Sequence, residues 1–296
     1  MFKKVLALLT NLSRLPEMLG CYRETHEWLA VTLAYLGLRK LPSPFNLHLR
    51  SGETLTLEER IDMVIFWLVF VRRHYPVNAS DRVIIDVGAN IGLFTIYAAR
   101  QAPGAKIIAI EPFPETCRRL RRQVEDNHFA DRVTVLNCAV AEKTGWGEMD
   151  SAEGIPSQYR RIRSEVTATL NAKHRGGAAL EELPGVPVEN RTLADILELA
   201  GADNVDLMKM NIHGSEYAVL MNTPARVLQR FRRIAVQYHE LPAAVEMGKT
   251  QLFSYLGKNG FRLVCDKDTR GGSGRAVLSI PPHDVPSDGG DKVRAA

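Results

Sequence analysis

The chain has 296 residues, and its content of 45% hydrophobic and 24% charged residues is typical of a globular protein that buries a core. Its longest apolar run, nine residues at 63–71, is far shorter than the roughly 20 residues that span a bilayer, so no transmembrane helix is predicted. The net charge of +4 comes largely from RRLRR at 118–122 and QRFRR at 229–233, which fit solvated helix faces, and no nucleic-acid partner is expected. Four scattered cysteines without a C-x-x-C pair indicate reduced thiols, no metal site and a cytoplasmic location.

Three regions are predicted along the chain. Residues 1–44 form a helical extension, residues 45–280 form the main domain, and residues 281–296, rich in Pro, Gly and Asp, form a disordered tail. Helical spacing of apolar residues in the extension predicts two helices packed on the main domain. The alternative is that these helices contact a membrane surface or a second protomer.

The main domain is expected to open with a β-hairpin over 45–57, because apolar and polar residues alternate on both sides of a Ser-Gly turn. Thr56 and Glu59 then predict a capping box for a helix from Leu57 to His74. The apolar run inside this segment suggests that the helix is buried between layers.

Strands and helices alternate through the rest of the domain, which predicts an α/β fold with a doubly wound sheet. The predicted strands lie at about 83–86, 106–110, 133–140, 205–210, 233–241, 261–266 and 276–280. The predicted helices cover 91–101, a segment that begins at 114, 192–200, a segment that follows 211–215, and 243–259. Residues 141–188 are irregular and are expected to form loops and short strands that grip a substrate above the sheet.

The first of these strands is followed by an unusual glycine turn, D-x-G-x-N-x-G, formed by Asp86, Gly88, Asn90 and Gly92. A carboxylate at the start of the turn repels a pyrophosphate but accepts hydrogen bonds from an ammonium group. S-adenosyl-L-methionine carries an ammonium and no phosphate, and Glu111 at the end of the second strand is placed to accept its ribose hydroxyls. This pattern predicts S-adenosyl-L-methionine as the cofactor, with a dinucleotide site or a plain structural turn as alternatives.

An ordered set of motifs resembles the FkbM family of S-adenosylmethionine-dependent methyltransferases. The motifs are LHLRSGETLTL, VIIDVGANIGLFT, IEPFPET, NCAV, TLADIL, DLMKMNIHGSE and FSYLGKNGFRL, in the family's order between Leu47 and Ile280. The resemblance implies a seven-stranded, mostly parallel, Rossmann-like class I methyltransferase sheet and methylation of a hydroxyl on a glycan or secondary metabolite. It implies cofactor contacts at Asp86, Gly88, Asn90, Gly92, Glu111, Asn137, Cys138 and Ala139.

The sequence departs from the family pattern at the end of the fourth strand. The family typically has Lys-Ile-Asp-x-Glu-Gly there, whereas this chain has Asn211 and His213 at the acidic positions. A Glu that is common in the fifth strand is replaced by Gln237. Three negative charges are missing, and a divalent-metal mechanism is disfavoured because hard cations prefer carboxylate oxygens.

Four residues near these strand ends are candidates for catalysis. His213 and His239 are candidate general bases, because imidazole has an unperturbed pKa near neutrality. Lys209 and Asn211 share a face by strand alternation and are expected to orient the acceptor, although Lys209 also fits a structural ion pair. Glu216 is explained by its place in the first turn of the next helix, where the helix dipole favours an acid.

The resulting hypothesis is an O-methyltransferase with a small-molecule or glycan acceptor. A catalytically inert binding or assembly module on the same fold is the first alternative, because of the missing acids at 211, 213 and 237 and the apolar N-terminal extension. An NAD-dependent oxidoreductase is the second alternative.

Overall fold

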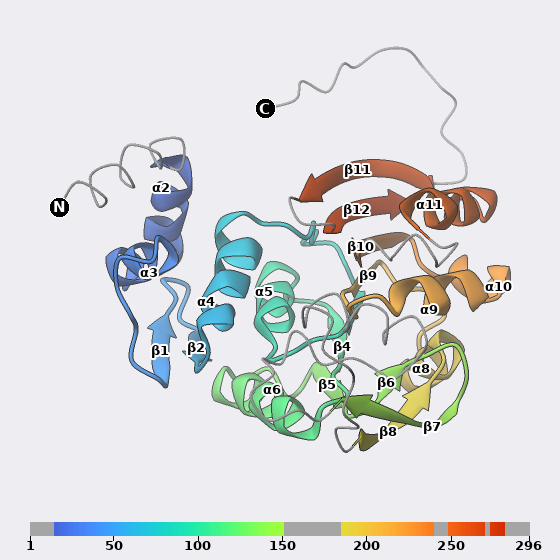
Figure 1. Ribbon diagram of the computed structural model, residues 1–296, viewed down its shortest axis with the longest axis horizontal. Coiled ribbons are helices and arrows are strands. Elements are labelled where there is room, and N and C mark those ends of the chain that lie inside the picture. The colour runs from blue at the N-terminus through green and yellow to red at the C-terminus, as the bar shows by residue number, and fades with distance from the viewer. Residues whose placement is uncertain (1–14, 151–184, 240–247, 270–272, 282–296) are drawn as a thin grey trace, which may run out of the picture.

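A computed structural model gives the fold of the chain and describes residues 15–150, 185–239, 248–269 and 273–281 (Figure 1). Four expectations fall outside these ranges: the helix over the first residues, the loops within 151–184, the start of the helix expected at 243, and the tail after 281. No helix among the described residues is long and apolar enough to cross a bilayer.

The centre of the fold is a seven-stranded sheet with strand order β11-β12-β10-β9-β3-β4-β5. Its strands are β3 (Val83–Val87), β4 (Lys106–Ile110), β5 (Val133–Leu136), β9 (Leu207–Met210), β10 (Arg233–His239), β11 (Arg262–Thr269) and β12 (Ser273–Ser279). Neighbouring strands are parallel except around β12, which is antiparallel to both β10 and β11. The predicted α/β fold, a doubly wound seven-stranded and mostly parallel sheet, is therefore confirmed.

Helices cover both faces of this sheet, and successive strand residues enter different hydrophobic clusters because strand side chains alternate. Ile84 belongs to a cluster with α4, α5 and α6, whereas Ile85 belongs to a cluster with α8, α9, α10 and α11. The helices are α4 (Arg60–Phe66), α5 (Leu93–Gln101), α6 (Pro114–Asp126), α8 (Leu193–Ala200), α9 (Glu216–Asn222), α10 (Ala225–Leu228) and α11 (Lys249–Lys258). Burial on both faces explains the continuous β-branched run of the first sheet strand.

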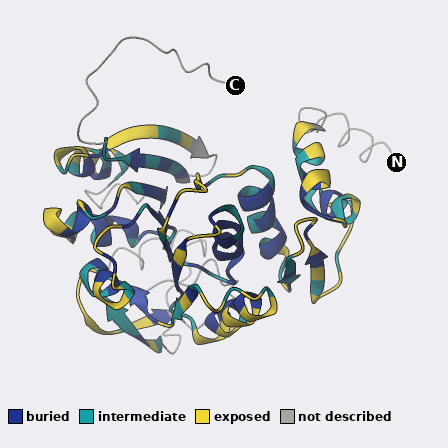
Figure 2. Cartoon of the chain, turned by 180° about the vertical axis from the view of Figure 1, so that it is seen from behind, coloured by how far each residue is buried: buried dark blue, intermediate teal, exposed yellow. Residues whose placement is uncertain are grey.

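The N-terminal elements are α2 (Leu15–Glu24), α3 (Trp28–Tyr35), β1 (Phe45–His48) and β2 (Thr54–Leu57), and they lie beyond α4 as seen from the sheet (Figure 1). β1 and β2 pair antiparallel, as predicted for the hairpin. The ring of Tyr35 stacks on Trp67 with centroids 4.2 Å apart, and Trp67 Nε1 donates to Glu17 Oε2 at 2.6 Å. Both helices therefore pack on the main domain, while α2 keeps an exposed side (Figure 2).

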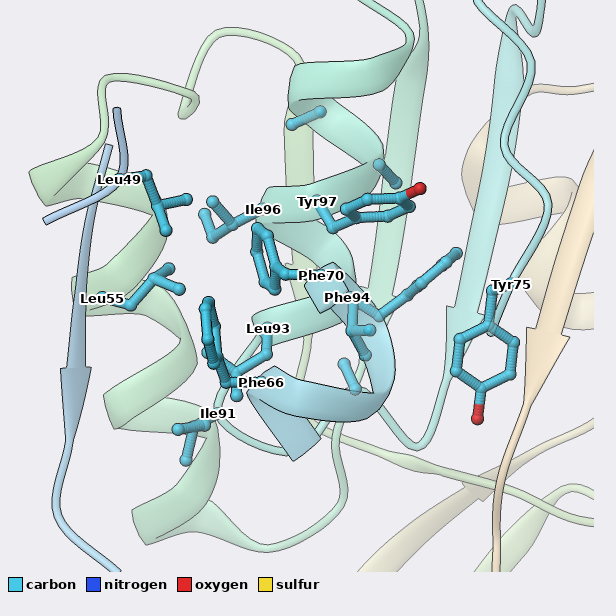
Figure 3. Close-up of a cluster of buried hydrophobic side chains, with 14 of the residues drawn as sticks. Leu49, Leu55, Phe66, Phe70, Tyr75, Ile91, Leu93, Phe94, Ile96 and Tyr97 are labelled. Atoms are coloured by element: carbon cyan, nitrogen blue, oxygen red, sulfur yellow. The ribbon is translucent and has the colours of Figure 1, made fainter. Parts of the chain in front are cut away.

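The helix after the hairpin begins later than the sequence predicts. Thr56 pairs with Asn46 inside the hairpin and cannot cap a helix; the capping box is formed instead by Glu59 and Asp62. The helix α4 then continues into a π-helical turn, Trp67–Val71, and ends before His74. Figure 3 shows aromatic side chains of this segment packed beside α5.

The predicted third strand, 133–140, is divided between two sheets. β5 ends at Leu136, and β6 (Ala139–Val140) joins a separate three-stranded sheet with β8 (Gly185–Arg191) and β7 (Gly145–Asp150), in the order β6-β8-β7. Asn137 lies between them, and its Nδ2 donates to the backbone oxygens of Glu111 and Pro112, each at 2.9 Å. These bonds turn the chain out of the main sheet, a long-range effect that local alternation does not reveal.

β3 and β9 are neighbours in the sheet, and the strand order reverses between them. Ligands of open α/β sheets bind outside the carboxyl ends of the strands at such a reversal. The residues that follow β3, β4, β9 and β10 are therefore the candidates for function.

Candidate functional site

The glycine turn after β3 depends on left-handed backbone conformations. Gly88, Asn90 and Gly92 have φ angles of 75°, 52° and 91°, which favour glycine and tolerate asparagine. A Cβ on Gly88 would lie 2.1 Å from the backbone oxygen of Asn211, and a Cβ on Gly92 would lie 2.5 Å from Leu120 Cδ1. The residue types found in this turn are thus required by its conformation and by close packing around it.

Glu111 follows β4 and holds the turn from its other side. Its Oε2 accepts the backbone N–H of Asn90 at 2.9 Å, and its Oε1 accepts the backbone N–H of Phe113 at 3.1 Å. The side chain is 8% exposed. Burial raises the pKa of this carboxyl to about 7, partly offset by the two N–H donors. Each carboxylate oxygen keeps acceptor capacity for a further donor, such as a ligand hydroxyl.

Asp86 lies below the turn and is completely buried. Lys209 Nζ is 2.9 Å from Asp86 Oδ1, and Thr95 Oγ1 donates to Asp86 Oδ2 at 2.7 Å. The same ammonium donates to the backbone oxygen of Gly88 at 2.7 Å. Asp86 is expected from the sequence to contact a ligand ammonium directly, but its side chain has no exposed surface for such a contact. Lys209 forms the structural ion pair that was its alternative interpretation, and the pair fixes the position of the Gly88 carbonyl.

The segment after β5 contributes one exposed residue near Glu111. Asn137 is exposed and bonds to the backbone on both sides of the Glu111–Pro112 peptide. Cys138 and Ala139 are buried, and burial raises the pKa of the Cys138 thiol to about 11. Asn137 is therefore the member of this predicted group whose side chain lies next to the turn, and Cys138 is a neutral packing thiol.

A histidine–glutamate group lies after β9 and β10. Glu216, with no exposed surface, places Oε1 2.7 Å from His239 Nδ1 and accepts the backbone N–H of Gly214 through Oε2 at 2.7 Å. The rings of His213 and His239 have centroids 5.1 Å apart. The structure thus brings both predicted histidines together and adds Glu216, which sequence reasoning had explained by the helix dipole alone. The sequence signal that could have identified Glu216 as a site residue is its position shortly after Gly214, at the end of the fourth predicted strand.

Asn211 connects this group to the glycine turn. Its backbone N–H donates to the backbone oxygen of Val87, the residue just before Gly88, at 3.0 Å. Its Oδ1 is buried without a hydrogen-bond partner among the described residues. Gln237 and Asn211 follow the paired residues Val236 and Met210, and Tyr75 Oη donates to Gln237 Oε1 at 3.4 Å. Tyr75 stands at the margin of the aromatic cluster in Figure 3, and nothing in its local sequence predicted this position.

Among the described residues, no three His, Cys, Asp or Glu side chains are grouped so as to hold a metal ion. The charged groups of the site are instead paired with each other or with backbone N–H groups. The arrangement combines a rigid turn, a carboxylate with raised pKa and an imidazole oriented by a buried acid. Such a set can bind a hydroxyl-bearing ligand and accept a proton.

Comparisons with known proteins point to one family. A family model described as the methyltransferase FkbM domain matches residues 86–263. The chain is 28% identical to methyltransferase sdnD of Sordaria araneosa over 202 residues, which cover 64% of this chain and 76% of that protein. It is 28% identical to 31-O-demethyl-FK506 methyltransferase FkbM of Streptomyces tacrolimicus over 237 residues, covering 75% and 86%. Among solved structures it resembles M. jannaschii TYW2 in complex with AdoMet, at 15% identity and a TM-score of 0.40, covering 81% and 87%.

Proposed function

Because the chain belongs to the FkbM methyltransferase family, we propose that it transfers a methyl group from S-adenosyl-L-methionine to a hydroxyl oxygen of a small molecule or glycan. Membership confirms the resemblance predicted from the ordered motifs, and it supports methyltransferase activity with S-adenosyl-L-methionine as cofactor. The relative named as a 31-O-demethyl-FK506 methyltransferase supports oxygen as the acceptor atom and a small molecule as the acceptor. Membership argues against the NAD-dependent oxidoreductase.

The observation that carries the proposal is the position of Glu111 beside the glycine turn. Its carboxylate is held by the Asn90 and Phe113 amides at the ends of two adjacent parallel strands. Ribose hydroxyls that donate to this carboxylate would stabilise its charged form, which burial otherwise disfavours. The residues present therefore fit the cofactor: Glu111 would hold its ribose, and the turn from Gly88 to Gly92 would lie against it.

The cofactor supplies an electrophilic methyl group, so the remaining requirement is an acceptor oxygen aligned in line and relieved of its proton. His239 is the proposed proton acceptor because its Nδ1 is held by Glu216 at 2.7 Å. With Nδ1 protonated, Nε2 keeps its lone pair for the hydroxyl proton. As the acceptor oxygen bonds to the methyl carbon and the sulfonium sulfur leaves with the electron pair of the broken sulfur–methyl bond, that proton would pass to Nε2. His213 and Asn211 line the same strand ends and position the acceptor, while Lys209 acts through the turn.

Calorimetric titration with S-adenosylhomocysteine tests the cofactor site. The wild-type protein is expected to bind, and Glu111→Gln is expected to bind about tenfold more weakly, because charge-assisted bonds to hydroxyls are lost. Glu115→Gln, the same change at an exposed position of α6, is the matched control. Absence of binding by the wild type, or equal affinity in Glu111→Gln, contradicts the proposal.

An inert binding module is the second candidate, and one observation favours it: Asn211 Oδ1 is buried with no hydrogen-bond partner in the described part of the chain, at a position where the resemblance implies an acid. Methyl transfer from labelled cofactor to a panel of hydroxylated small molecules and oligosaccharides separates the two. Any product labelled at oxygen excludes the inert module. Cofactor binding without turnover over the whole panel would favour it.

A further inference from the structure

A row of four polar residues crosses the carboxyl edge of the sheet. Gln237 of β10 is directly opposite Arg275 of β12, and Arg275 is directly opposite Lys267 of β11. On the other side of Gln237 comes Asn211, which follows the paired residues Val236 and Met210. Directly opposite residues of adjacent strands project to the same face. We call these four residues, Asn211, Gln237, Arg275 and Lys267, the edge row.

The edge row contains two cations and no carboxylate. Within the part of the chain that the structure describes, no acid lies at ion-pair distance from Arg275 or Lys267. Arg275 Nη1 donates to the backbone oxygen of His74 at 3.0 Å. The adjacent Arg72, by contrast, is paired with Glu17 at 3.1 Å. The guanidinium and the ammonium therefore leave a net positive charge that these neighbours do not neutralise.

The pKa of one neighbouring group agrees with this uncompensated charge. Burial and the charges of Arg275, Arg72 and Lys267 lower the pKa of His74 to about 3, so this imidazole is neutral at physiological pH. Burial lowers the pKa of Arg275 as well. A partly buried cation without a counter-ion is costly, and a ligand anion relieves that cost.

The edge row also has a defined position relative to the donor turn. Its first member, Asn211, lies against Gly88, and Arg275 is two strands away, a separation of about 10 Å at normal strand spacing. Arg275 is partly exposed and Lys267 is exposed. Both cations therefore lie on the face of the sheet that Gln237 and Asn211 share.

We propose that Arg275 and Lys267 form a binding site for an anionic group, a carboxylate or a phosphate, on the methyl acceptor. The acceptor is then a hydroxylated acid whose anionic group and reacting hydroxyl are separated by about 10 Å. This inference rests on the proposed function for the identity of the ligand. The anion site itself is defined by the edge row alone.

The test uses inorganic phosphate and acetate as probes, each titrated at an ionic strength kept constant with chloride. The readouts are the side-chain Nε–Hε signal of Arg275 in NMR spectra and the apparent dissociation constant. Saturable binding is expected, with Arg275→Gln about tenfold weaker. Gln237→Glu places a carboxylate opposite Arg275 and is expected to weaken anion binding similarly without loss of the fold. Arg262→Gln, the same charge change at an exposed position at the other end of β11, is the matched control and is expected to bind as the wild type.

The two probes distinguish the sources of the anion: saturation by phosphate alone indicates a phosphorylated acceptor, and saturation by acetate indicates an acid. Binding that does not saturate, or that falls equally in Arg275→Gln and Arg262→Gln, overturns the inference. S-adenosylhomocysteine affinity is measured on the same variants. Absence of saturable anion binding by the wild type, together with normal S-adenosylhomocysteine binding, refutes the anion site only. Saturable anion binding by a wild type that does not bind S-adenosylhomocysteine refutes the cofactor site only.

Discussion

The two sides of the site differ in how completely their polar groups are paired. On the side proposed to bind the cofactor, Asp86 pairs with Lys209, and Glu111 accepts two backbone N–H groups. On the side proposed to bind the acceptor, Asn211 Oδ1 is buried without a partner and Arg275 has no acid beside it, both within the described residues. The cofactor side is therefore rigid before ligand binding, whereas the acceptor side keeps polar capacity that a ligand can satisfy.

The largest expected effect comes from breaking the pair below the cofactor turn. Lys209→Met leaves the Asp86 carboxylate buried without a counter-charge, and we expect unfolding to become easier by about 3–5 kcal/mol. Denaturant unfolding measures this change, with Lys106→Met at an exposed position of β4 as the control. The double variant Asp86→Asn/Lys209→Met should recover part of the stability. Equal stability of Lys209→Met and the control would mean that the pair does not organise the turn.

A smaller loss is expected when the turn itself is altered. Gly88→Ala forces an alanine to φ 75° and places its Cβ against the Asn211 carbonyl, at a cost of roughly 2–4 kcal/mol and a loss of S-adenosylhomocysteine binding. Gly52→Ala is the control because Gly52 also has a positive φ, 111°, but nothing lies within 4 Å of the added Cβ. It should lose only about 1–2 kcal/mol and keep its affinity. Similar losses in both variants would show that backbone strain, not contact with Asn211, decides the turn.

On the acceptor side, Glu216→Gln removes the charged partner of His239 and is expected to lower kcat about a hundredfold, with S-adenosylhomocysteine affinity unchanged. Glu198→Gln, an exposed acid of α8, is the control. His239→Asn should be at least as slow as Glu216→Gln, because it removes the proposed proton acceptor itself. If His213→Asn causes the larger loss instead, the base is His213.

The smallest effect is a pH dependence of the cofactor side. The Glu111 pKa of about 7 lies above the ordinary value of 4.5, so this carboxyl favours the folded state below about pH 4.5, and that contribution is lost as the pH rises through about 7. A cofactor that requires the charged form should bind about tenfold more weakly at pH 6 than well above pH 7. Denaturant unfolding and calorimetry of wild type and Glu111→Gln measure both trends. If the wild type and Glu111→Gln have the same affinity and the same free energy of unfolding at every pH, the carboxyl does not have this role.

The difference between the proposed cofactor side and the proposed acceptor side also explains how much of the molecule the sequence could predict. The strands, the turn at Gly88 and Gly92, and the position of Glu111 follow from β-branched runs, glycine spacing and strand ends, which are local signals. The sequence places the capping box at Thr56, whereas the structure has it at Glu59, because Thr56 is paired with Asn46 in the hairpin. It also does not separate β6 from β5, because Asn137 turns the chain through contacts with Glu111.

The acceptor side depends on contacts between distant segments, which one sequence does not encode visibly. Glu216 meets His239 across 23 positions, and Tyr75 meets Gln237 across 162. The edge row can be recognised only when the order of the four strands that carry it is known, including the antiparallel β12. Local pattern identified its members Asn211 and Gln237 but gave no reason to join Arg275 to them.

The role of Glu111 in cofactor binding can be measured by calorimetric titration of S-adenosylhomocysteine into wild type and Glu111→Gln at pH 6 and pH 8. The wild type is expected to bind more tightly at pH 8 than at pH 6, and Glu111→Gln is expected to bind more weakly and without dependence on pH. A wild type that does not bind, or two proteins with the same affinity at both pH values, would contradict this role.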